Sequence, residues 1–348
     1  MKGKDSMLFC SSHTGFTAPD AENPVQLLYK ATDRFNRQMQ DIETRCSDPD
    51  EDRCGLMSET TRAILEMSFV CEQFEREHDG DLDVVKNAQA EFRKKTDFLF
   101  RKSYFMNRAR TWPQGYPGDY QTLEGFYNNR TLSEGLGYYL DRHFLSTTLA
   151  VAVRERKKKQ AEILVQELKQ RKAPHILDIA CGSCRELFEL ASSLKVADAM
   201  VTCVDFDGDA LDFSAARMAH AGLSGDQMQF RKYNALKMIN HERNVREFGM
   251  QDVIYSVGLF DYLDGEVLTR LLSALYHLLQ PGGTLIAPFK DARRYRSQEY
   301  HWFVVWEGFF QRTVEDMWRL FEKAGIPLVS VSVSRDRSGV IVFFKIDR

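Results

Sequence analysis

Residues 175–186 read HILDIACGSCRE, and this stretch decides the fold. Its apolar first half predicts a buried strand, and Gly182 lies in a tight turn of small residues that leads into a predicted helix at residues 185–190. A strand, a glycine turn and a helix N-terminus form a cradle in which the backbone approaches a ligand. The dinucleotide-binding fingerprint needs glycine at three set positions, and only Gly182 fits, which disfavours NAD.

A second predicted strand, residues 200–204, ends at Asp205, about 20 residues past the turn, where an acidic side chain binds ribose hydroxyls. With these residues in place, the stretch DIACGSC, residues 178–184, resembles the glycine motif of class I S-adenosylmethionine-dependent methyltransferases, with Cys184 where the last glycine is usual. The resemblance implies S-adenosylmethionine as the cofactor. The alternative is a plain strand–helix turn in another doubly wound protein.

Strands and helices alternate after about residue 171, which predicts an α/β fold with a parallel sheet covered by helices on both faces. The expected strands are residues 175–180, 200–204, 228–232, 252–257, 284–288, 328–333 and 340–345, and the expected helices are 185–194, 210–221, 264–279 and 314–324, with 236–248 undecided. Residues 334–339 are too few for a parallel crossover, so the last strand must be antiparallel. A seven-stranded, doubly wound (Rossmann-like) sheet with an antiparallel last strand is also the methyltransferase arrangement.

The chain before this sheet reads as helices. We expect a flexible tail at residues 1–23, a helical N-terminal domain at 24–170 and the methyltransferase domain at 171–348. Within the helical domain the pattern predicts helices at 24–44, from Ser58 onward, at 82–107 and at 132–171. The basic run at residues 154–159 is typical of a solvated helix face.

Residues 111–120 read TWPQGYPGDY, and their two prolines and two glycines exclude regular structure. Aromatic and acidic groups that are concentrated in a loop have a functional role more often than residues of the packed core do. We interpret residues 111–127 as a lid over cofactor and substrate; the alternative is a stiff linker that covers the domain junction.

Ligands of an open parallel sheet lie at the carboxyl ends of its strands. The residues there that we expect to bind the cofactor are Asp178, Ala180, Gly182, Arg185, Asp205, Phe206, Asn234, Ala235, Ser256 and Gly258. Asp205 is expected to hold the ribose and Phe206 to pack on the adenine. The amide carbonyl of Asn234 could accept a bond from the adenine amino group, as an acid commonly does in the family.

The stretch GLFDYL, residues 258–263, together with YPGDY at 116–120 resembles a narrower group, the bacterial methyltransferases that make the methyl ester of 3-hydroxypalmitic acid. The candidate bases or orienting groups are Tyr116, Asp119, Asp261 and Tyr262, with His143 and His301 as weaker candidates. The expected substrate-binding residues are Tyr120, Lys290, Arg293, Arg294, Tyr295 and Trp302. Their basic members favour an anionic acceptor, and the apolar stretch after residue 300 predicts a wall for an acyl or aromatic group or a cover for the helical domain.

Composition and net charge limit which other classes of protein this chain could belong to. The 348-residue chain is 43% hydrophobic with a formal net charge of −3, which disfavours a nucleic-acid binder, and it contains no apolar run long enough for a membrane span. The N-terminus has no secretory pattern and the seven cysteines have no regular spacing, so we expect a cytoplasmic protein with reduced thiols. Cys181 and Cys184 form a CxxC pair, but no second pair of soft ligands accompanies it, so we expect no metal; a redox role or simple packing in a cramped turn are the alternatives.

These observations predict S-adenosylmethionine-dependent methyl transfer to an oxygen of a small, acidic, amphipathic metabolite by a protein that could form a homodimer. The alternatives are an N-methyltransferase of small molecules and a non-catalytic module that binds the cofactor. An RNA or protein methyltransferase is disfavoured by the net charge and by the sequence SVGL at residues 256–259, where an enzyme acting on nucleobase amino groups would carry an Asn-Pro-Pro-Tyr-type tetrad.

Overall fold

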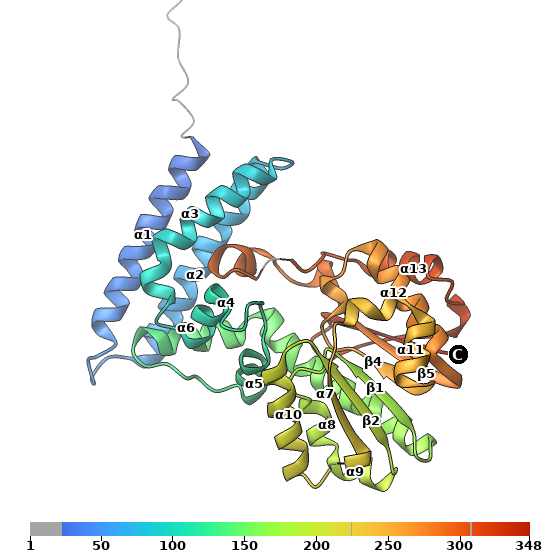
Figure 1. The fold of residues 1–348 in the computed structure, drawn as a ribbon. Coiled ribbons are helices and arrows are strands. Elements are labelled where there is room, and N and C mark those ends of the chain that lie inside the picture. The colour runs from blue at the N-terminus through green and yellow to red at the C-terminus, as the bar shows by residue number, and fades with distance from the viewer. Residues whose placement is uncertain (1–22, 224, 307) are drawn as a thin grey trace, which may run out of the picture.

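A computed structural model describes residues 23–223, 225–306 and 308–348. The described residues before β1 (His175–Ile179) form helices joined by loops, and the residues after them form a sheet with helices on both faces (Figure 1). The helices of the first part are α1 (Pro24–Arg45), α2 (Arg53–Glu77), α3 (Leu82–Phe100), α4 (Tyr104–Thr111), α5 (Tyr120–Asn128), α6 (Leu136–Ser146) and α7 (Thr148–Gln170). The expected tail at residues 1–23 lies almost wholly outside the described residues.

The sheet has seven strands in the order β3-β2-β1-β4-β5-β7-β6. Their bounds are β1 (His175–Ile179), β2 (Met200–Asp205), β3 (Met228–Lys232), β4 (Gln251–Tyr255), β5 (Leu279–Lys290), β6 (Val331–Arg335) and β7 (Ile341–Asp347). The first five are parallel, whereas β7 inserts between β5 and β6 and runs antiparallel to both. The predicted α/β fold with an antiparallel last strand is confirmed.

Helices cover the two faces of the sheet in the alternating manner that parallel crossovers require. These helices are α8 (Arg185–Glu189), α9 (Ala191–Val196), α10 (Gly208–His220), α11 (His241–Phe248), α12 (Gly265–Leu278) and α13 (Val314–Lys323). Successive residues of β1 face opposite sides: Ile176 belongs to a core shared with α7, α9 and α10, and Leu177 to a core shared with α12 and α13. Helix α7 therefore joins the helical part to the sheet.

Three helix boundaries differ from the predicted ones because capping side chains decide them. Helix α2 begins five residues before Ser58, since Asp52 accepts a hydrogen bond from the backbone of Cys54. The predicted helix at 82–107 is two helices, because Ser103 caps α4 through the backbone N–H of Met106 at 3.1 Å. Extended backbone at Thr147 (φ −61°, ψ 154°) likewise separates α6 from α7.

A segment between β5 and α13, residues 298–306, reaches across to the helical part, and we call it the arm (Figure 1). Trp302 is fully buried there, and its indole N–H donates to Glu75 of α2 at 2.7 Å. Arg110 donates to the carbonyl of Phe303 at 2.7 Å, and the indole of Trp112 donates to that of Val305 at 2.7 Å. The arm therefore ties the sheet to α2, α3 and α4.

Over the described residues, no helix combines the length and the apolar character needed to cross a membrane.

Candidate functional site

A cavity of about 310 Å³ opens at the carboxyl ends of β1, β2, β4 and β5, beneath the loop before α5. The lining combines the turn after β1, the ends of the other strands, two residues of α7 and one tryptophan of the arm. Its members are Tyr116, Pro117, Gly118, Tyr120, Leu123, Val153, Arg156, Ala180, Gly182, Asp205, Phe206, Val257, Gly258, Leu259, Tyr262, Lys290 and Trp306. The fold thus brings residues from widely separated parts of the chain to one hollow.

The turn after β1 is held against the end of β2 by backbone contacts. The N–H of Gly182 donates to Oδ2 of Asp205 at 2.8 Å, and the N–H of Asp207 donates to its Oδ1 at 3.0 Å. Burial raises the pKa of Asp205, although these backbone donors oppose that shift. Asp205 is therefore a fixed acceptor at the cavity wall.

This wall fits a nucleoside cofactor. Gly182 has φ +51°, and a Cβ placed on it would meet no atom within 4 Å, so space lies open beside the turn. Each oxygen of Asp205 accepts one backbone bond, and a carboxylate has about four acceptor sites, so two remain for ribose hydroxyls. The ring of Phe206 is half-exposed and meets Tyr116 at 4.9 Å between centroids, which presents an aromatic surface to a base.

Helix α7 contributes a cation that sequence reasoning missed. Arg156 lines the cavity, is 4% exposed, and its Nε has no hydrogen-bond partner. Among the described residues no carboxylate forms an ion pair with it. Gly258, at φ +110°, allows this approach, because a Cβ there would lie 3.2 Å from Nη1 of Arg156.

The prediction that residues 154–159 form a solvated face is therefore wrong for its buried members, Arg156 and Lys157. Their positions three and four residues after Val153 put them on the side of α7 that faces the core and the cavity. This spacing is the signal that could have identified Arg156.

Lys290 is a second cation at the cavity, at the end of β5. Its Nζ donates to Oδ2 of Asp261, and its backbone N–H donates to Oδ1 at 3.2 Å. Burial lowers the pKa of Lys290, and the charge of Asp261 opposes that shift. Asp261 itself is 2% exposed and does not line the cavity, so it acts on Lys290 from behind.

The loop at residues 111–120 covers the cavity through its aromatic side chains. Tyr116 donates its hydroxyl to Oδ2 of Asp207 at 2.8 Å, and burial, followed by this bond, raises its pKa. Gly118 lies so close to Trp306 that a Cβ would meet Cζ2 of the indole at 2.8 Å. Asp119 points away: it caps α5 through the N–H groups of Gln121 and Thr122.

Asp119 also forms a buried ion pair with Arg108 at 2.6 Å. It therefore orients the loop and lies outside the cavity, whereas Tyr116 and Tyr120 face into it. Tyr262 faces in as well and accepts a hydrogen bond from the indole of Trp306 at 2.6 Å. Burial raises the pKa of Tyr262 to about 12, so this phenol stays protonated at neutral pH.

Several predicted site residues do not line the cavity. Asp178, Arg185, Asn234, Ala235, Ser256, Arg293, Arg294, Tyr295 and Trp302 are absent from its wall. The arm carries Trp302 into the helical core, and Arg293 is exposed and paired with Glu315, so the structure places both expected substrate-binding residues away from the cavity. Asn234 caps the turn after β3 through the N–H of Leu236, and Tyr295 donates to Gln311.

Arg185 belongs to an ion-pair network that sequence reasoning also missed. Glu124 of α5 accepts from Arg185 at 2.8 Å, from Arg217 at 2.7 Å and from the hydroxyl of Ser183 at 2.7 Å. These bonds outweigh burial and lower the pKa of Glu124. The network therefore locks the helix after the loop onto the turn after β1.

A small apolar hollow adjoins the main cavity and shares Val153, Lys290 and Trp306 with it. Its other lining residues are Phe126, Phe144, Thr147, Leu149, Ala150, Tyr300 and Phe309. Lys290 therefore lies where the main cavity, which Arg156 also lines, meets an apolar interior built from α5, α6, α7 and the arm.

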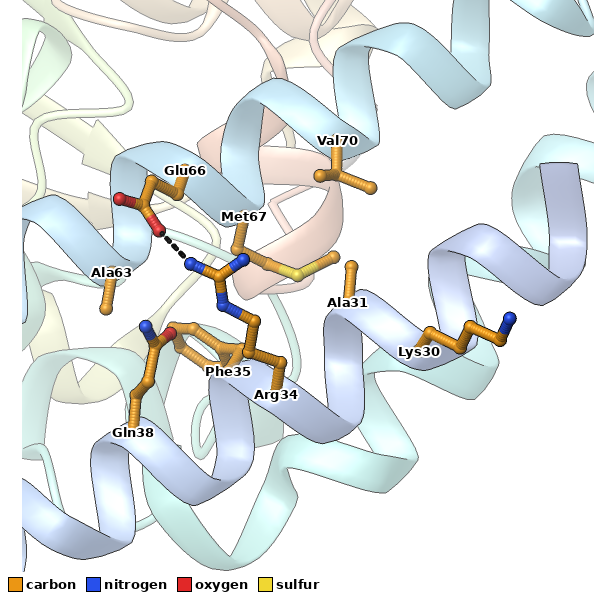
Figure 2. Close-up of a pocket in the computed structure, with 9 residues that line it drawn as sticks. All are labelled: Lys30, Ala31, Arg34, Phe35, Gln38, Ala63, Glu66, Met67 and Val70. Atoms are coloured by element: carbon orange, nitrogen blue, oxygen red, sulfur yellow. Dashed lines mark hydrogen bonds and ion pairs between the residues drawn. The ribbon is translucent and has the colours of Figure 1, made fainter. Parts of the chain in front are cut away.

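Another hollow lies far from the sheet, between α1 and α2 (Figure 2). Figure 2 shows Arg34 and Glu66 reaching toward one another across it, and their charged groups pair at 3.4 Å. Both side chains are largely exposed, so this hollow is a solvated groove between two helices and presents no convergent buried polar groups.

Comparison with known proteins gives the class. Residues 177–285 match the family model described as a methyltransferase domain. No curated protein matches the chain. The crystal structure of a possible exported protein from Bordetella parapertussis superposes with a TM-score of 0.54 and 18% identity, covering 94% of this chain and 99% of that one, which shows a shared fold.

Two further solved structures, both of enzymes with a named activity, superpose on this chain with lower TM-scores. A magnesium protoporphyrin IX methyltransferase from Synechocystis PCC 6803 with bound S-adenosylmethionine matches at 15% identity and a TM-score of 0.40, covering 57% of this chain and 83% of that one. A 1,6-didemethyltoxoflavin-N1-methyltransferase from Burkholderia thailandensis matches at 15% identity and a TM-score of 0.38, covering 57% and 80%.

The domain match and the sheet topology define the class of protein. Residues 177–285 form a methyltransferase domain, built on the seven-stranded sheet. Asp205 and the turn at Gly182 are the residues whose geometry fits a nucleoside cofactor such as S-adenosylmethionine.

Proposed function

We propose that the enzyme methylates an oxygen of a small acidic molecule with an apolar body, and that the acceptor is a carboxylate. The observation that carries this proposal is Arg156: a buried guanidinium without an ion-pair partner among the described residues, in the wall of a largely apolar cavity. A buried guanidinium needs an anionic partner, and a carboxylate matches its fork geometry.

S-adenosylmethionine supplies an electrophilic methyl group on a sulfonium. The protein's own residues bind the cofactor, orient the acceptor and exclude water from the cavity. Asp205 would hold the ribose hydroxyls, Arg156 and Lys290 would orient the acidic acceptor, and Trp306 with Tyr116 would shield the cavity from water.

The protonation states of the lining residues favour an acceptor that is already ionised. Tyr116 and Tyr262 remain protonated, and Asp205 is the one carboxylate among the described residues that line the cavity. A carboxylate acceptor needs no general base, whereas a protonated amine must lose a proton and would be repelled by Arg156 and Lys290. Methylation of nitrogen is therefore the less supported alternative.

We further propose that residues 24–170 act as a helical domain that walls the acceptor, that residues 171–348 carry the cofactor side, and that residues 111–127 act as the lid between them. The support is the shared lining: Tyr116, Leu123 and Arg156 come from the first segment, and Asp205 and Lys290 from the second.

The test compares acceptors that share one apolar chain and differ in their head group. A 3-hydroxy fatty acid, the matching alcohol and the matching amine are incubated with isotopically labelled cofactor, and methylated products are identified by mass spectrometry. We expect the acid to be methylated at its carboxylate. Preferential methylation of the amine would contradict the proposal, and cofactor binding without turnover of any acceptor would favour the non-catalytic alternative.

Arg156→Met is expected to raise the KM for the acid about 10- to 100-fold, because a charge-assisted hydrogen bond contributes about 1.5–3 kcal/mol. The affinity for the cofactor, measured by calorimetry, should stay within about twofold. Arg293→Met is the matched control, since Arg293 is exposed and follows the same strand as Lys290. A loss of cofactor affinity in Arg156→Met would assign this guanidinium to the cofactor instead.

A further inference from the structure

Three cysteines and an aspartate converge behind the turn after β1. The ligand atoms of Asp178, Cys181, Cys184 and Cys203 all lie within 4.8 Å of one another, and all four residues are buried. The sequence shows no second pair of soft ligands beside Cys181 and Cys184, and the structure adds one thiol, Cys203, and one carboxylate, Asp178. None of the four lines the main cavity, so the cluster is separate from the proposed acceptor site.

The register of the sheet explains how the cluster forms. Asp178 of β1 and Cys203 of β2 are direct partners in a parallel pair, so their side chains emerge side by side on one face. The turn then folds back over that face, because the N–H of Cys181 donates to the carbonyl of Val204 at 3.1 Å and the N–H of Cys184 donates to that of Cys181 at 3.0 Å.

Cys184 occupies a backbone conformation that favours glycine. Its φ is +47°, and a non-glycine residue in this region costs about 1 kcal/mol. This is also the position where related glycine motifs end in glycine. A side chain at this strained position, pointing into the cluster, suggests that the thiol itself is required.

The distance between two of the sulfurs is compatible with a shared metal ion as well as with direct contact between thiols. The Sγ atoms of Cys184 and Cys203 are 3.6 Å apart, and two thiolates on a tetrahedral zinc ion with bonds of about 2.3 Å are separated by about 3.8 Å. A disulfide would require about 2.05 Å and would join only two of the three sulfurs.

An independent observation comes from Asp178. Its carboxylate belongs to the cluster, the residue is 1% exposed, and its Oδ2 has no hydrogen-bond partner. Buried polar atoms are nearly always satisfied, and an unsatisfied one costs about 1–3 kcal/mol. A cation shared with the cysteines would satisfy this oxygen.

We propose that Asp178, Cys181, Cys184 and Cys203 form a structural zinc site. Three sulfurs and one carboxylate oxygen make a closed four-coordinate set, which leaves no position for water or substrate, so the ion would brace the fold and take no part in methyl transfer. It would join β1, β2 and the turn at the point where Gly182 meets Asp205.

The test measures zinc in the purified full-length protein, with any affinity tag removed and no cofactor present. Elemental analysis after gel filtration should find about one zinc per chain. Cys203→Ser and Asp178→Asn should each lower the zinc content at least about fivefold. Cys71→Ser is the matched control, because Cys71 is equally buried but lies in α2, and it should retain the metal.

A measurement on the wild-type protein tests the site even if the variants fail to fold. After chelation and addition of Co²⁺, the wild-type protein should develop thiolate-to-cobalt charge-transfer absorption that one equivalent saturates. Absence of both zinc and this absorption would overturn the proposal. So would a mass lower by two hydrogens that localises a disulfide to these cysteines. Because no cofactor or acceptor is used, the outcome is independent of the proposed function.

Discussion

At the scale of single residues, burial determines which ionisable groups can act. Arg156 and Lys290 face the cavity, while Asp119 and Asp261, which the sequence indicates as candidate bases, lie behind it and hold Arg108 and Lys290. A motif shows which residue types gather at a strand end. It does not show which of two neighbours turns toward the ligand, because that depends on the caps and ion pairs that form around each one.

His143 of α6 shows how burial couples to pH. Both of its ring nitrogens lack hydrogen-bond partners, and burial lowers its pKa from 6.5 to about 4. The unfolded chain therefore binds a proton at a higher pH than the folded chain does, and stability falls as the pH decreases from about 6.5 to about 4. The difference corresponds to about 3 kcal/mol.

We expect His143→Leu to remove this loss of folding stability at low pH. Urea unfolding at pH 7 and pH 4 should show wild type losing about 3 kcal/mol more than the variant over this range. The exposed His220, changed to leucine, is the control and should leave the wild-type pH dependence intact. Parallel curves for wild type and His143→Leu would contradict the assignment.

At the scale of elements, short contacts between segments distant in the sequence assemble the site. Helix α5 holds the turn after β1 through Glu124, and the arm holds α4 through its backbone carbonyls. The apolar stretch after residue 300 was expected to wall the substrate or to cover the helical domain. The structure divides these roles between neighbours, since Trp302 packs in the helical core and Trp306 lines the cavity.

Glu124→Gln should loosen this attachment. It removes the charge that Arg185 and Arg217 share, so we expect a loss of about 2 kcal/mol or more in unfolding free energy, because Arg217 loses its charged partner and Arg185 keeps only its pair with Glu189. Affinity for the cofactor should fall about tenfold, because the turn after β1 is held less firmly once the charged acceptor of Arg185 and Arg217 is lost.

The control for this prediction is Glu315→Gln, which breaks the exposed pair with Arg293 and should change stability by less than about 0.5 kcal/mol. Urea unfolding and calorimetry on both variants make the comparison. Equal, small effects in the two variants would show that α5 does not hold the turn.

At the scale of the whole molecule, periodicity was sufficient for the fold. Alternating strands and helices, with a short last connection, predicted the seven-stranded sheet and its antiparallel strand, because these features depend on local pattern and chain length. The site was harder to predict, because Arg156 stands in a run of charged residues and Cys203 lies on β2, whereas the CxxC pair lies in the turn after β1. Both depend on which face a helix or strand turns inward, and only the packed structure fixes that.

We propose that the carboxyl edge of this sheet binds S-adenosylmethionine through Asp205 and the turn at Gly182. Calorimetric titration of the cofactor into wild type, Asp205→Ala and the nearby exposed Asp209→Ala tests it most directly. We predict one site per chain, a loss of about 100-fold or more in Asp205→Ala because two hydrogen bonds to a charged acceptor disappear, and an unchanged affinity in Asp209→Ala. Equal affinities in all three proteins, or no binding to wild type, would contradict the account.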